Sequence, residues 1–305
     1  MNFFEEDKFP LVSIITLNHN HAPVTAAFLE SSKKLTYPRF EILVCDMASQ
    51  ENSLSTLDPA GYPNTRFLFS KENLGYAAGN NWGIRQSNGS FIFIVNNDTI
   101  LTPGILNSLL EPFTKDDSIG VVCPKIKYFE NPEIIQYAGF CPMNPFTGRT
   151  SSIGDLETDR GQHDVSGVTH GAHGCAMMVK RDVIVKTGMF PEKFFLYYEE
   201  WDWSARIQKA GYLIWYQSEA TIFHRESITV GKENNIKAYY LTRNRILYMR
   251  RNSDLFHLFI FLMFFIFISF PKAIFTYTKN RQFSQLKWFL RGIGYNMVHS
   301  SKSVQ

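Results

Sequence analysis

The stretch Phe91-Ile92-Phe93-Ile94-Val95-Asn96-Asn97-Asp98-Thr99 decides the fold that this sequence predicts. Its first five residues are apolar and mostly β-branched or aromatic, which is typical of a strand buried on both faces within a parallel sheet. Two amides and a carboxylate end the run, and open α/β sheets bind ligands at the carboxyl ends of their strands. Asn96 and Asp98 point to the same side of an extended segment, so both can face one cation. The alternative is an Asx turn that only closes the strand, because Asn and Asp commonly form such turns.

Length and composition indicate one large α/β domain with an appendage. The chain has 305 residues, of which 45% are hydrophobic and 19% charged, enough for a sizeable core. A formal net charge of +3 is too small to favour nucleic acid as a partner. The four scattered cysteines favour a reducing compartment and no zinc site. The acidic N-terminus has no apolar stretch of signal length, so we expect no secretory signal.

Strands and helices alternate along most of the chain. The second half of residues 73–84 has helical character, and residues 129–167 show no sustained period, as expected of a long functional loop. We expect strands at residues 11–17, 41–46, 66–69, 91–95, 120–124, 174–180, 212–216 and 220–224, and helices at 24–35, 103–113, 181–187 and 204–210. This alternation predicts a doubly wound, mostly parallel sheet.

Two further polar groups lie late in the chain. Glu199, Glu200 and Asp202 stand just before a predicted helix, where the helix dipole favours negative charge, so they can be a capping cluster. His224 ends the last predicted strand, and a structural histidine is the ordinary interpretation of such a position. The residues alone leave a functional role open for both groups.

The last quarter of the chain contains a basic stretch followed by an apolar one. Residues 243–251 include four arginines, and the apolar run 255–270 is shorter than the ~20 residues of a simple spanning helix. Extending the run through Pro271 to Tyr277 reaches that length at the cost of a proline and a buried lysine. Because the run is apolar all round, we favour a membrane-embedded or interfacial hairpin with residues 285–296 as its amphipathic return. A crossing helix and an oligomer interface are the alternatives.

Taken together, these segments resemble family 2 glycosyltransferases, which are inverting GT-A-fold enzymes that use nucleotide-sugar donors. The bacterial rhamnosyltransferase-like branch is the most similar, and the resemblance covers about residues 10–228. It rests on six motifs in the family's order, at residues 12–18, 44–49, 73–83, 96–98, 199–202 and 224. It implies a GT-A domain at residues 1–228 and a C-terminal helical membrane-association region at residues 229–305.

The resemblance implies a divalent metal site. Asp98 is the implied main ligand, Asn96 is a weaker or water-mediated one, and His224 closes the site from the far side. A cation that bridges the donor phosphates stabilises the charge on the departing nucleotide. Oxygen ligands with one imidazole suit Mn²⁺ or Mg²⁺ and tilt the choice toward Mn²⁺. Because Asn96 replaces the first Asp of the D-x-D motif, we expect the metal to bind together with the donor.

The resemblance also implies a catalytic base and a donor pocket. Glu200 is the expected base for the acceptor hydroxyl, a role typically worth on the order of 10²–10⁴ in rate. Glu199 and Asp202 would orient Glu200 or hold acceptor hydroxyls. Arg243 or Arg245 would grip the diphosphate or the phosphates of an acceptor lipid, with a membrane-surface role as the alternative. The implied residues of the donor nucleotide pocket are Thr16, Asn18, Asp46, Asn73, Gly75, Gly79, Asn80 and Asn97.

The expected function is inverting, non-processive transfer of one sugar from a UDP- or dTDP-sugar. The expected acceptor is a glycan or polyprenyl-linked glycan of cell-envelope polysaccharide biosynthesis, at the cytoplasmic face of the inner membrane. A processive synthase is disfavoured because residues 285–288 do not match the Q-x-x-R-W motif and only one strongly apolar run exists. A nucleotidyltransferase would need a Gly-rich, Arg-containing loop at residues 18–21, and a non-catalytic carbohydrate-binding relic would not keep the acidic residues and the histidine.

Overall fold

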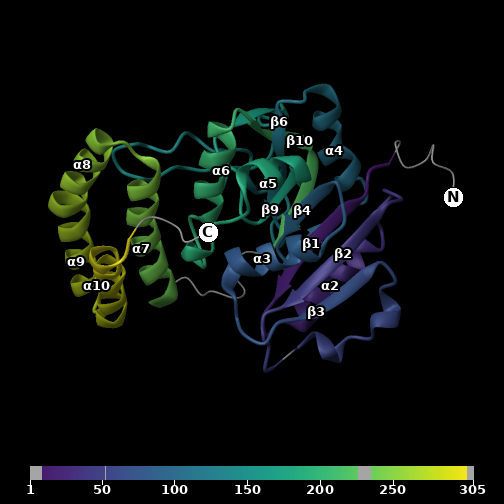
Figure 1. Cartoon of the computed structure of the whole chain (residues 1–305), viewed down its shortest axis with the longest axis horizontal. Coiled ribbons are helices and arrows are strands. Elements are labelled where there is room, and N and C mark those ends of the chain that lie inside the picture. The colour runs from purple at the N-terminus through teal and green to yellow at the C-terminus, as the bar shows by residue number, and fades with distance from the viewer. Residues whose placement is uncertain (1–8, 52, 226–234, 301–305) are drawn as a thin grey trace.

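A computed structural model of the chain describes residues 9–51, 53–225 and 235–300. One mixed sheet with helices on both faces forms the larger part, and a separate group of helices at the C-terminal end stands beside it (Figure 1). The expected α/β architecture with a helical appendage is therefore present.

The N-terminal half of the sheet is parallel, as predicted. It contains β1 (Val12–Asn18), β2 (Phe40–Asp46), β3 (Thr65–Phe69) and β4 (Phe91–Val95) in the order β3-β2-β1-β4. Ile92 to Val95 are at most 2% exposed, so β4 is the buried central strand that its apolar run predicts. Parallel pairing of β1 with β2 sets Asn18 opposite Asp46 at the carboxyl ends of both strands.

The other half of the sheet is mixed rather than parallel throughout. β9 (Ala176–Lys180) runs antiparallel to β4 and to β6 (Ile119–Tyr128). β6 pairs in parallel with β10 (Leu213–His224), and β5 (Thr99–Leu101) adds an antiparallel edge to β10. The short strand β7 (Ile135–Tyr137) pairs with β6 within the segment expected to be a loop, and β8 (Gly167–Thr169), which begins at the end of that segment, pairs with β10.

β10 is one strand where the sequence predicts two. Its pairing with β6 shifts between Gln217 and Thr221, so the polar residues there form an irregularity within a continuous strand. A bulge of this kind interrupts the alternation of buried and exposed residues without ending the strand. The continuity matters because β10 carries His224 to its carboxyl end.

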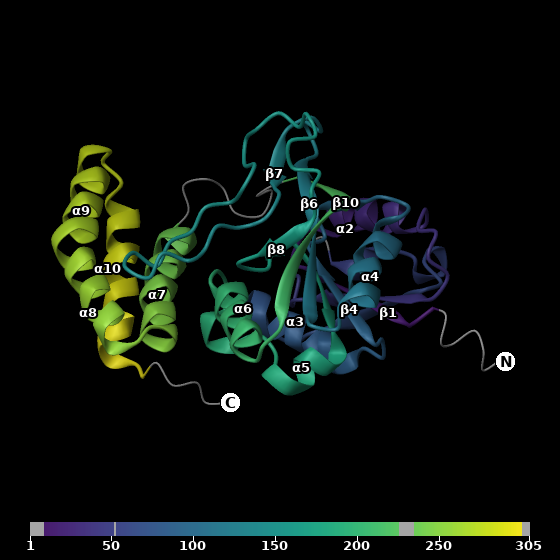
Figure 2. The same cartoon turned by 90° about the horizontal axis from the view of Figure 1, so that it is seen from above.

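Five helices cover the two faces of the sheet. On one face lie α2 (Ala22–Ser32) and α4 (Ile105–Lys115), and on the other lie α3 (Gly75–Gln86), α5 (Arg181–Thr187) and α6 (Glu199–Lys209) (Figure 2). The helix expected at residues 204–210 begins earlier, so the acidic cluster forms the first turn of α6.

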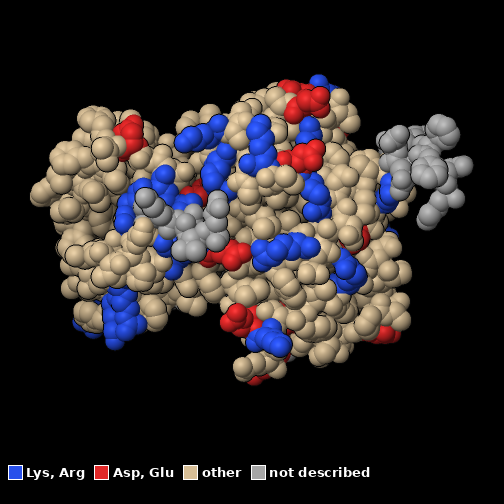
Figure 3. Space-filling view, in the orientation of Figure 1, with Lys and Arg blue, Asp and Glu red and all other residues tan. Residues whose placement is uncertain are grey.

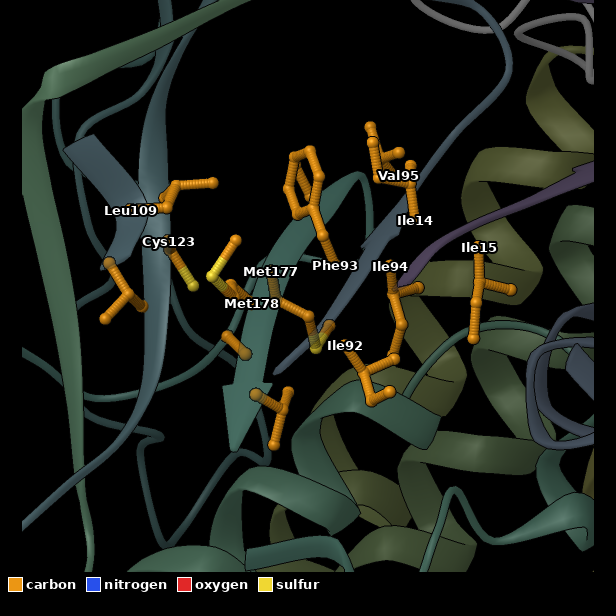
Figure 4. Close-up of a cluster of buried hydrophobic side chains, with 14 of the residues drawn as sticks. Ile14, Ile15, Ile92, Phe93, Ile94, Val95, Leu109, Cys123, Met177 and Met178 are labelled. Carbon is orange, nitrogen blue, oxygen red and sulfur yellow. The ribbon is translucent and has the colours of Figure 1, made fainter. Parts of the chain in front are cut away.

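The core between these layers is made of side chains from several distant segments. Phe93 of β4 lies with Met177 and Met178 of β9, Cys123 of β6 and Leu109 of α4 (Figure 4). All five side chains are fully buried. This packing fixes the carboxyl end of β4, where the polar residues begin.

The C-terminal helices fold back on themselves, and residues 285–296 lie in the returning helix, as expected. α7 (Asn235–Asn252) lies beside the sheet domain, and α10 (Phe283–Val298) packs between α7 and an outer helix (Figures 1 and 2). That outer helix consists of α8 (Leu255–Phe264), a π-helical segment (Phe265–Ser269) and α9 (Phe270–Lys279).

The outer helix does not break at Pro271 and runs through all 25 residues from Leu255 to Lys279. Proline lacks a backbone N–H, and the π-helical turn that precedes Pro271 changes the local hydrogen bonding so that the helix continues. With a mean hydropathy of 2.4 over its most apolar window, this helix is long and apolar enough to cross a membrane by length and composition. Only 11% of that window is buried.

Candidate functional site

Polar side chains meet at the carboxyl ends of β1 and β2. The Nδ2 atom of Asn18 donates to Oδ2 of Asp46 at 3.0 Å, and its Oδ1 accepts from the hydroxyl of Thr25 at 2.9 Å. The hydroxyl of Thr25 in turn accepts from Nδ2 of Asn97 at 2.7 Å. Three of the residues predicted for the donor pocket are therefore joined in one network, through a threonine that the sequence did not single out.

Asp46 also holds the loop that follows β2. Its Oδ1 accepts from the backbone N–H of Ser49 at 2.7 Å, and its Oδ2 accepts from the backbone N–H of Leu54 at 3.2 Å. With Asn18 as a further donor, the carboxylate is already well satisfied. A direct contact of Asp46 with a ribose or base would compete with these bonds.

Thr16 lies inside the sheet layer and has no exposed surface. Thr16 and Asn18 are two residues apart on β1, so their side chains lie on the same side of the strand. Its hydroxyl has no hydrogen-bond partner among the described residues. The structure therefore places Thr16 beneath the polar network, not on an open pocket wall.

The loop before α3 keeps two predicted donor residues near the surface. Oδ1 of Asn73 accepts from the backbone N–H of Gly75 at 2.9 Å. Gly75 has a φ of 73°, and a Cβ there would lie 2.5 Å from the ring of Phe195. A glycine is required at this position by backbone conformation and by packing.

Gly79 and Asn80, both predicted for the donor pocket, are buried within α3. A Cβ at position 79 would lie 2.9 Å from Sδ of Met47, so this glycine lets α3 approach the sheet closely. Asn80 is 1% exposed, and its Nδ2 donates to the carbonyl of Tyr76 at 2.9 Å. Gly79 therefore serves the packing of α3 against the sheet.

Asp98 and His224 come together where β5 pairs with the end of β10. Oδ1 of Asp98 lies 3.1 Å from Nε2 of His224, and both side chains are about nine-tenths buried. Neither of these two atoms has an aligned hydrogen-bond partner among the described residues. The far side of the ring is fixed, because Nδ1 donates to Oε1 of Gln136 at 2.8 Å. With Nδ1 donating to Gln136, Nε2 is the ring nitrogen directed toward Asp98.

Gly174 and Cys175 connect this pair to the start of α6. A Cβ on Gly174 would lie 3.8 Å from Cδ of Glu200. The backbone carbonyl of Cys175 accepts from the N–H of Asn96 at 2.9 Å, and its thiol interacts with the ring of His224. The end of β4, the end of β10 and the first turn of α6 therefore surround one dipeptide.

The surroundings of this dipeptide shift the pKa values of His224 and of Cys175 itself. Burial lowers the pKa of His224, but the neighbouring Cys175 and Asp98 outweigh it and raise the pKa well above its ordinary value. Burial raises the pKa of the Cys175 thiol, which stays protonated. Tyr76 donates its hydroxyl hydrogen to the carbonyl of Gly174 and closes the side near Glu200.

The carboxyl groups of Glu199 and Glu200 lie in a poorly solvated environment. Burial raises the pKa of Glu200 to about 7, and burial together with the charge of Glu200 raises the pKa of Glu199 well above its usual range. One carboxylate oxygen of each residue has no hydrogen-bond partner in the described part of the chain. Both carboxyl groups therefore hold a proton more tightly than exposed glutamates do.

The chain enters α6 through an unusual backbone conformation. Phe195, Tyr197 and Tyr198 have φ values of 64°, 68° and 71°, although none of them is glycine. Each left-handed residue of this kind costs on the order of 1–3 kcal/mol, and such positions persist only where surrounding contacts hold them.

Two residues of α7 supply those contacts. Nδ2 of Asn244, which has no exposed surface, reaches the carbonyls of Phe194, Leu196 and Tyr197 at 2.9, 2.7 and 2.7 Å. Arg243 donates to the carbonyl of Phe194 at 2.8 Å, so its guanidinium supports the turn and is not directed at a phosphate site. The C-terminal helices thereby hold the turn that positions Glu200.

Asp202 faces away from this turn. Its Oδ2 accepts from Nε of Arg251 at 2.7 Å and from Nδ2 of Asn252 at 3.0 Å, and its Oδ1 accepts from Nε of Arg206 at 3.3 Å. The side chain is 1% exposed. Both oxygens are thus engaged in attaching α6 to α7, and this geometry does not favour the predicted contact with Glu200 or with acceptor hydroxyls.

The described residues contain no group of three or more His, Cys, Asp or Glu side chains that could hold a metal ion. Asp98 and His224 supply only two ligands of suitable chemistry, an oxygen and an imidazole nitrogen. Asn96 is half-buried, and its backbone carbonyl accepts from the hydroxyl of Thr99 at 2.8 Å. A cation held by this pair needs further oxygen ligands from beyond the residues that the structure describes.

Several residues of the site were not predicted from the sequence. Gln136 and Cys175 lie in segments without a motif, and their roles depend on strand pairing that local patterns do not encode. Asn244 stands between two arginines in α7, and a buried asparagine at that position is a signal only when the exposure of the helix is known.

Known proteins resemble this chain in sequence and in fold. The model of "Glycosyl transferase family 2" matches residues 13–188, more than half of the chain. The N-acetylglucosaminyl-diphospho-decaprenol L-rhamnosyltransferase of Mycobacterium tuberculosis is 22% identical over 246 residues, which cover 73% of this chain and 78% of that protein.

Two solved structures share the fold. One is the mannosyltransferase PcManGT from Pyrobaculum calidifontis in complex with GDP-Man and Mn²⁺, with a TM-score of 0.58 and 14% identity, covering 95% of this chain and 88% of that one. The other is GalNAc-T7 with UDP, GalNAc and Mn²⁺, with a TM-score of 0.67 and 14% identity, covering 95% of this chain and 58% of that one. The predicted GT-A-type α/β fold is confirmed.

Proposed function

This chain belongs to glycosyl transferase family 2, and we propose that it transfers one sugar, with inversion, from a nucleotide-sugar donor to a lipid-linked glycan. That it is a glycosyltransferase follows from the family; the donor, the stereochemistry, the metal and the acceptor are our proposal. The observation that carries it is the meeting of Asp98, His224 and Glu200 around Gly174 and Cys175. A metal-ligand pair and a carboxylate base are the two groups that such a transfer needs.

We propose that Asp98 and His224 hold Mn²⁺ or Mg²⁺ together with the donor diphosphate. When bound, the cation neutralises charge on the departing nucleotide diphosphate. The chain supplies one oxygen and one nitrogen ligand, with His224 oriented by Gln136. The shortage of protein ligands fits binding of metal and donor together, and the two similar structures each contain a nucleotide or nucleotide sugar with Mn²⁺.

The donor nucleotide would lie along the carboxyl ends of β1 and β2, beside Asn18, Asn97 and the loop held by Asp46. Asn73 and Gly75 border this side from the start of α3. A pyrimidine nucleotide, UDP or dTDP, is our expectation for the rhamnosyltransferase-like branch. The buried residues Thr16, Gly79 and Asn80 would support the pocket from behind.

Glu200 is the proposed base. The oxygen of an acceptor hydroxyl forms the bond to the anomeric carbon while the bond from that carbon to the donor phosphate oxygen breaks. Glu200 takes the hydroxyl proton, and its pKa of about 7 makes the proton transfer feasible near neutral pH. Attack opposite the leaving diphosphate inverts the anomeric configuration.

The acceptor is proposed to be a lipid-linked glycan of cell-envelope polysaccharide biosynthesis, used at the cytoplasmic face of the inner membrane. The mycobacterial relative is named for a diphospho-decaprenol substrate. On the outer helix of this chain, Leu255, Phe256 and Phe267 expose 85%, 65% and 70% of their surfaces. The flank that α8 and α9 form is almost free of charged side chains (Figure 3). Such a surface suits peripheral or monotopic attachment of residues 229–305 to a membrane.

Thermal unfolding of the full chain in mild detergent tests the donor and metal proposals. A panel of UDP- and dTDP-sugars is added with Mn²⁺ or with EDTA. At 100 times its dissociation constant a ligand adds about 2.7 kcal/mol of stability. We expect one nucleotide class to raise Tm only with Mn²⁺ and to lose that effect in Asp98→Ala. The proposal fails if no nucleotide sugar stabilises the protein, or if stabilisation is equal in EDTA.

A further inference from the structure

A cavity of about 510 Å³ lies among the C-terminal helices, outside the site described above. Its walls come from α7, from the outer helix, from α10 and from the loop that carries Arg149. That loop leaves the sheet domain and reaches across to the helices (Figure 2). Arg149, Lys237 and Arg245 line the cavity, and its described lining includes no carboxylate.

Arg245 is the most informative residue of the lining. It is 6% exposed, and its Nε donates to the carbonyl of Thr147 at 2.6 Å. Its Nη2 is buried and has no hydrogen-bond partner among the described residues. A buried guanidinium group is costly unless its charge and its donors are satisfied. The cavity therefore lacks a negatively charged group at this point.

A second guanidinium group, that of Arg149, increases the need for a negatively charged partner in the cavity. Burial, and after it the positive charge of Arg149, lower the pKa of Arg245 to about 10. Two neighbouring guanidinium groups without a carboxylate are suited to phosphate, whose oxygens accept paired N–H donors. Arg149 is exposed at the mouth, whereas Arg245 lies inside.

Five further side chains of the wall are aliphatic or aromatic. Leu241, Phe265, Ala273, Tyr277 and Phe289 line the cavity, and the guanidinium of Arg245 lies 5.8 Å from the ring centre of Phe265. The outer helix that supplies part of this wall presents exposed apolar side chains on its other surfaces. A free phosphate would contact only the basic side chains, whereas a phosphate attached to a long apolar chain would also contact the apolar ones.

The cavity also reaches the turn that precedes the candidate base. Tyr198 lines it and donates its hydroxyl hydrogen to the carbonyl of Gly148 at 2.9 Å. Glu200 follows two residues later in the first turn of α6. An anion beside Arg149 and Arg245 therefore lies next to the turn that presents Glu200.

We propose that this cavity binds the phosphate or diphosphate group and the adjoining apolar chain of the lipid-linked acceptor, with Arg149 and Arg245 on the phosphate. The proposal deepens the function proposed above and rests on it. It assigns the acceptor's anionic group to the C-terminal helices and leaves the donor diphosphate at Asp98 and His224.

Calorimetric titration of the full chain with farnesyl diphosphate in EDTA and mild detergent tests this assignment. Inorganic diphosphate and farnesol are titrated in parallel. We expect farnesyl diphosphate to bind, inorganic diphosphate to bind about tenfold or more weakly, and farnesol not to bind. Equal affinity for the inorganic anion would mean a free-anion site, and equal affinity for farnesol would mean an apolar site; either result overturns the proposal.

Variants locate the binding. Arg149→Gln removes an exposed cation without disturbing the buried wall, and we expect it to weaken farnesyl diphosphate binding about tenfold or more, as loss of a charge-assisted contact does. Arg291→Gln is the matched control, because Arg291 is an exposed cation on α10 outside the cavity. Unchanged affinity in Arg149→Gln, or an equal loss in both variants, overturns the proposal.

The same proteins are tested for donor binding with Mn²⁺. Retained donor binding in Arg149→Gln together with lost farnesyl diphosphate binding supports two separate sites. If the unmodified protein binds the donor but not farnesyl diphosphate, only this inference fails. If it binds neither, the function proposed above fails with it.

Discussion

Nε of Arg251 in α7 lies 2.7 Å from Oδ2 of Asp202 in α6, and the Asp202 side chain is almost fully buried. This ion pair joins the C-terminal helices to the helix whose first turn carries Glu200. Asn244 makes a second connection through its bonds to the turn before α6. The proposed boundary at residue 228 thus divides the sequence, but both parts build the candidate site.

The first prediction concerns this ion pair. Asp202→Asn removes the buried carboxylate charge that Arg251 and Arg206 share, so we expect a loss of about 3–5 kcal/mol in the free energy of unfolding. Chemical denaturation measures it. Glu192→Gln is the control, because Glu192 pairs with Arg85 at the surface and its loss is expected to cost about 1 kcal/mol or less. Equal losses in the two variants would contradict the role given to Asp202.

The second prediction concerns the proposed base. Glu200→Gln should reduce transfer on the order of 10²–10⁴-fold, while donor affinity measured with Mn²⁺ stays near normal. In the unmodified enzyme kcat/KM should rise as pH increases through about 7, because Glu200 must lose its proton to act as a base. A pH profile that is flat between 6 and 8 would rule out this assignment.

The third prediction concerns the effect of the buried Glu199 carboxyl group on stability. Burial and the charge of Glu200 raise the pKa of Glu199 above its unfolded value near 4.5, so the folded state holds a proton that the unfolded state has lost. The contribution of Glu199 to stability is therefore fully present below pH 4.5 and is lost as pH rises through the folded pKa. Glu199→Gln imitates the protonated form, and we expect its Tm at pH 8 to rise by about 2–4 °C per kcal/mol recovered. A lower Tm at pH 8 would mean that Glu199 is ionised in the fold.

The fourth prediction concerns the histidine that faces Asp98. Gln136→Leu removes the oxygen that accepts the Nδ1 proton of His224 and should weaken Mn²⁺-dependent nucleotide binding about 10–100-fold. Titration of Mn²⁺ against a fixed nucleotide concentration measures the change. His224→Ala should remove the metal dependence altogether. If both variants keep the metal dependence of the unmodified protein, the ion binds elsewhere.

The fifth prediction concerns membrane attachment. Phe256→Glu and Phe267→Glu place charges at exposed positions of the outer helix, so neither is expected to disturb the core. Flotation with vesicles of anionic phospholipid should show clearly less bound protein in the double variant. Val185→Glu, at an exposed apolar position on α5, is the matched control. Equal flotation of all three proteins would exclude the outer helix as the attachment surface.

Local sequence patterns predict much of this structure, because a strand or helix and its end are often encoded within a few neighbouring residues. The apolar run of β4 and the polar residues that end it are read directly from residues 91–99. The direction of β9 was not predictable in this way, because an apolar strand carries no mark of the neighbour with which it pairs. The continuity of β10 was missed for a related reason, since the polar residues of a bulge look like a turn.

The residues of the candidate site were predictable from the sequence, but several of their partners were not. Asp98, His224 and Glu200 were chosen from a family resemblance, and the fold brings them around Gly174 and Cys175. Asp202 was expected beside the base, yet its partner Arg251 lies on a helix that the acidic motif does not include. Partners that come from distant segments are decided by packing, which a single sequence does not display.

The π-helical segment of the outer helix has a geometric consequence. Phe265, Ser269, Ala273 and Tyr277 recur every fourth residue, and all four line the same cavity. In a straight α-helix such a row would drift around the axis by about 40° at each step. The wider π turn advances less per residue and offsets part of this drift. Removing one residue between 265 and 269 would rotate the following turns about the helix axis. Ala273 and Tyr277 would then point away from the cavity, and other side chains would line it.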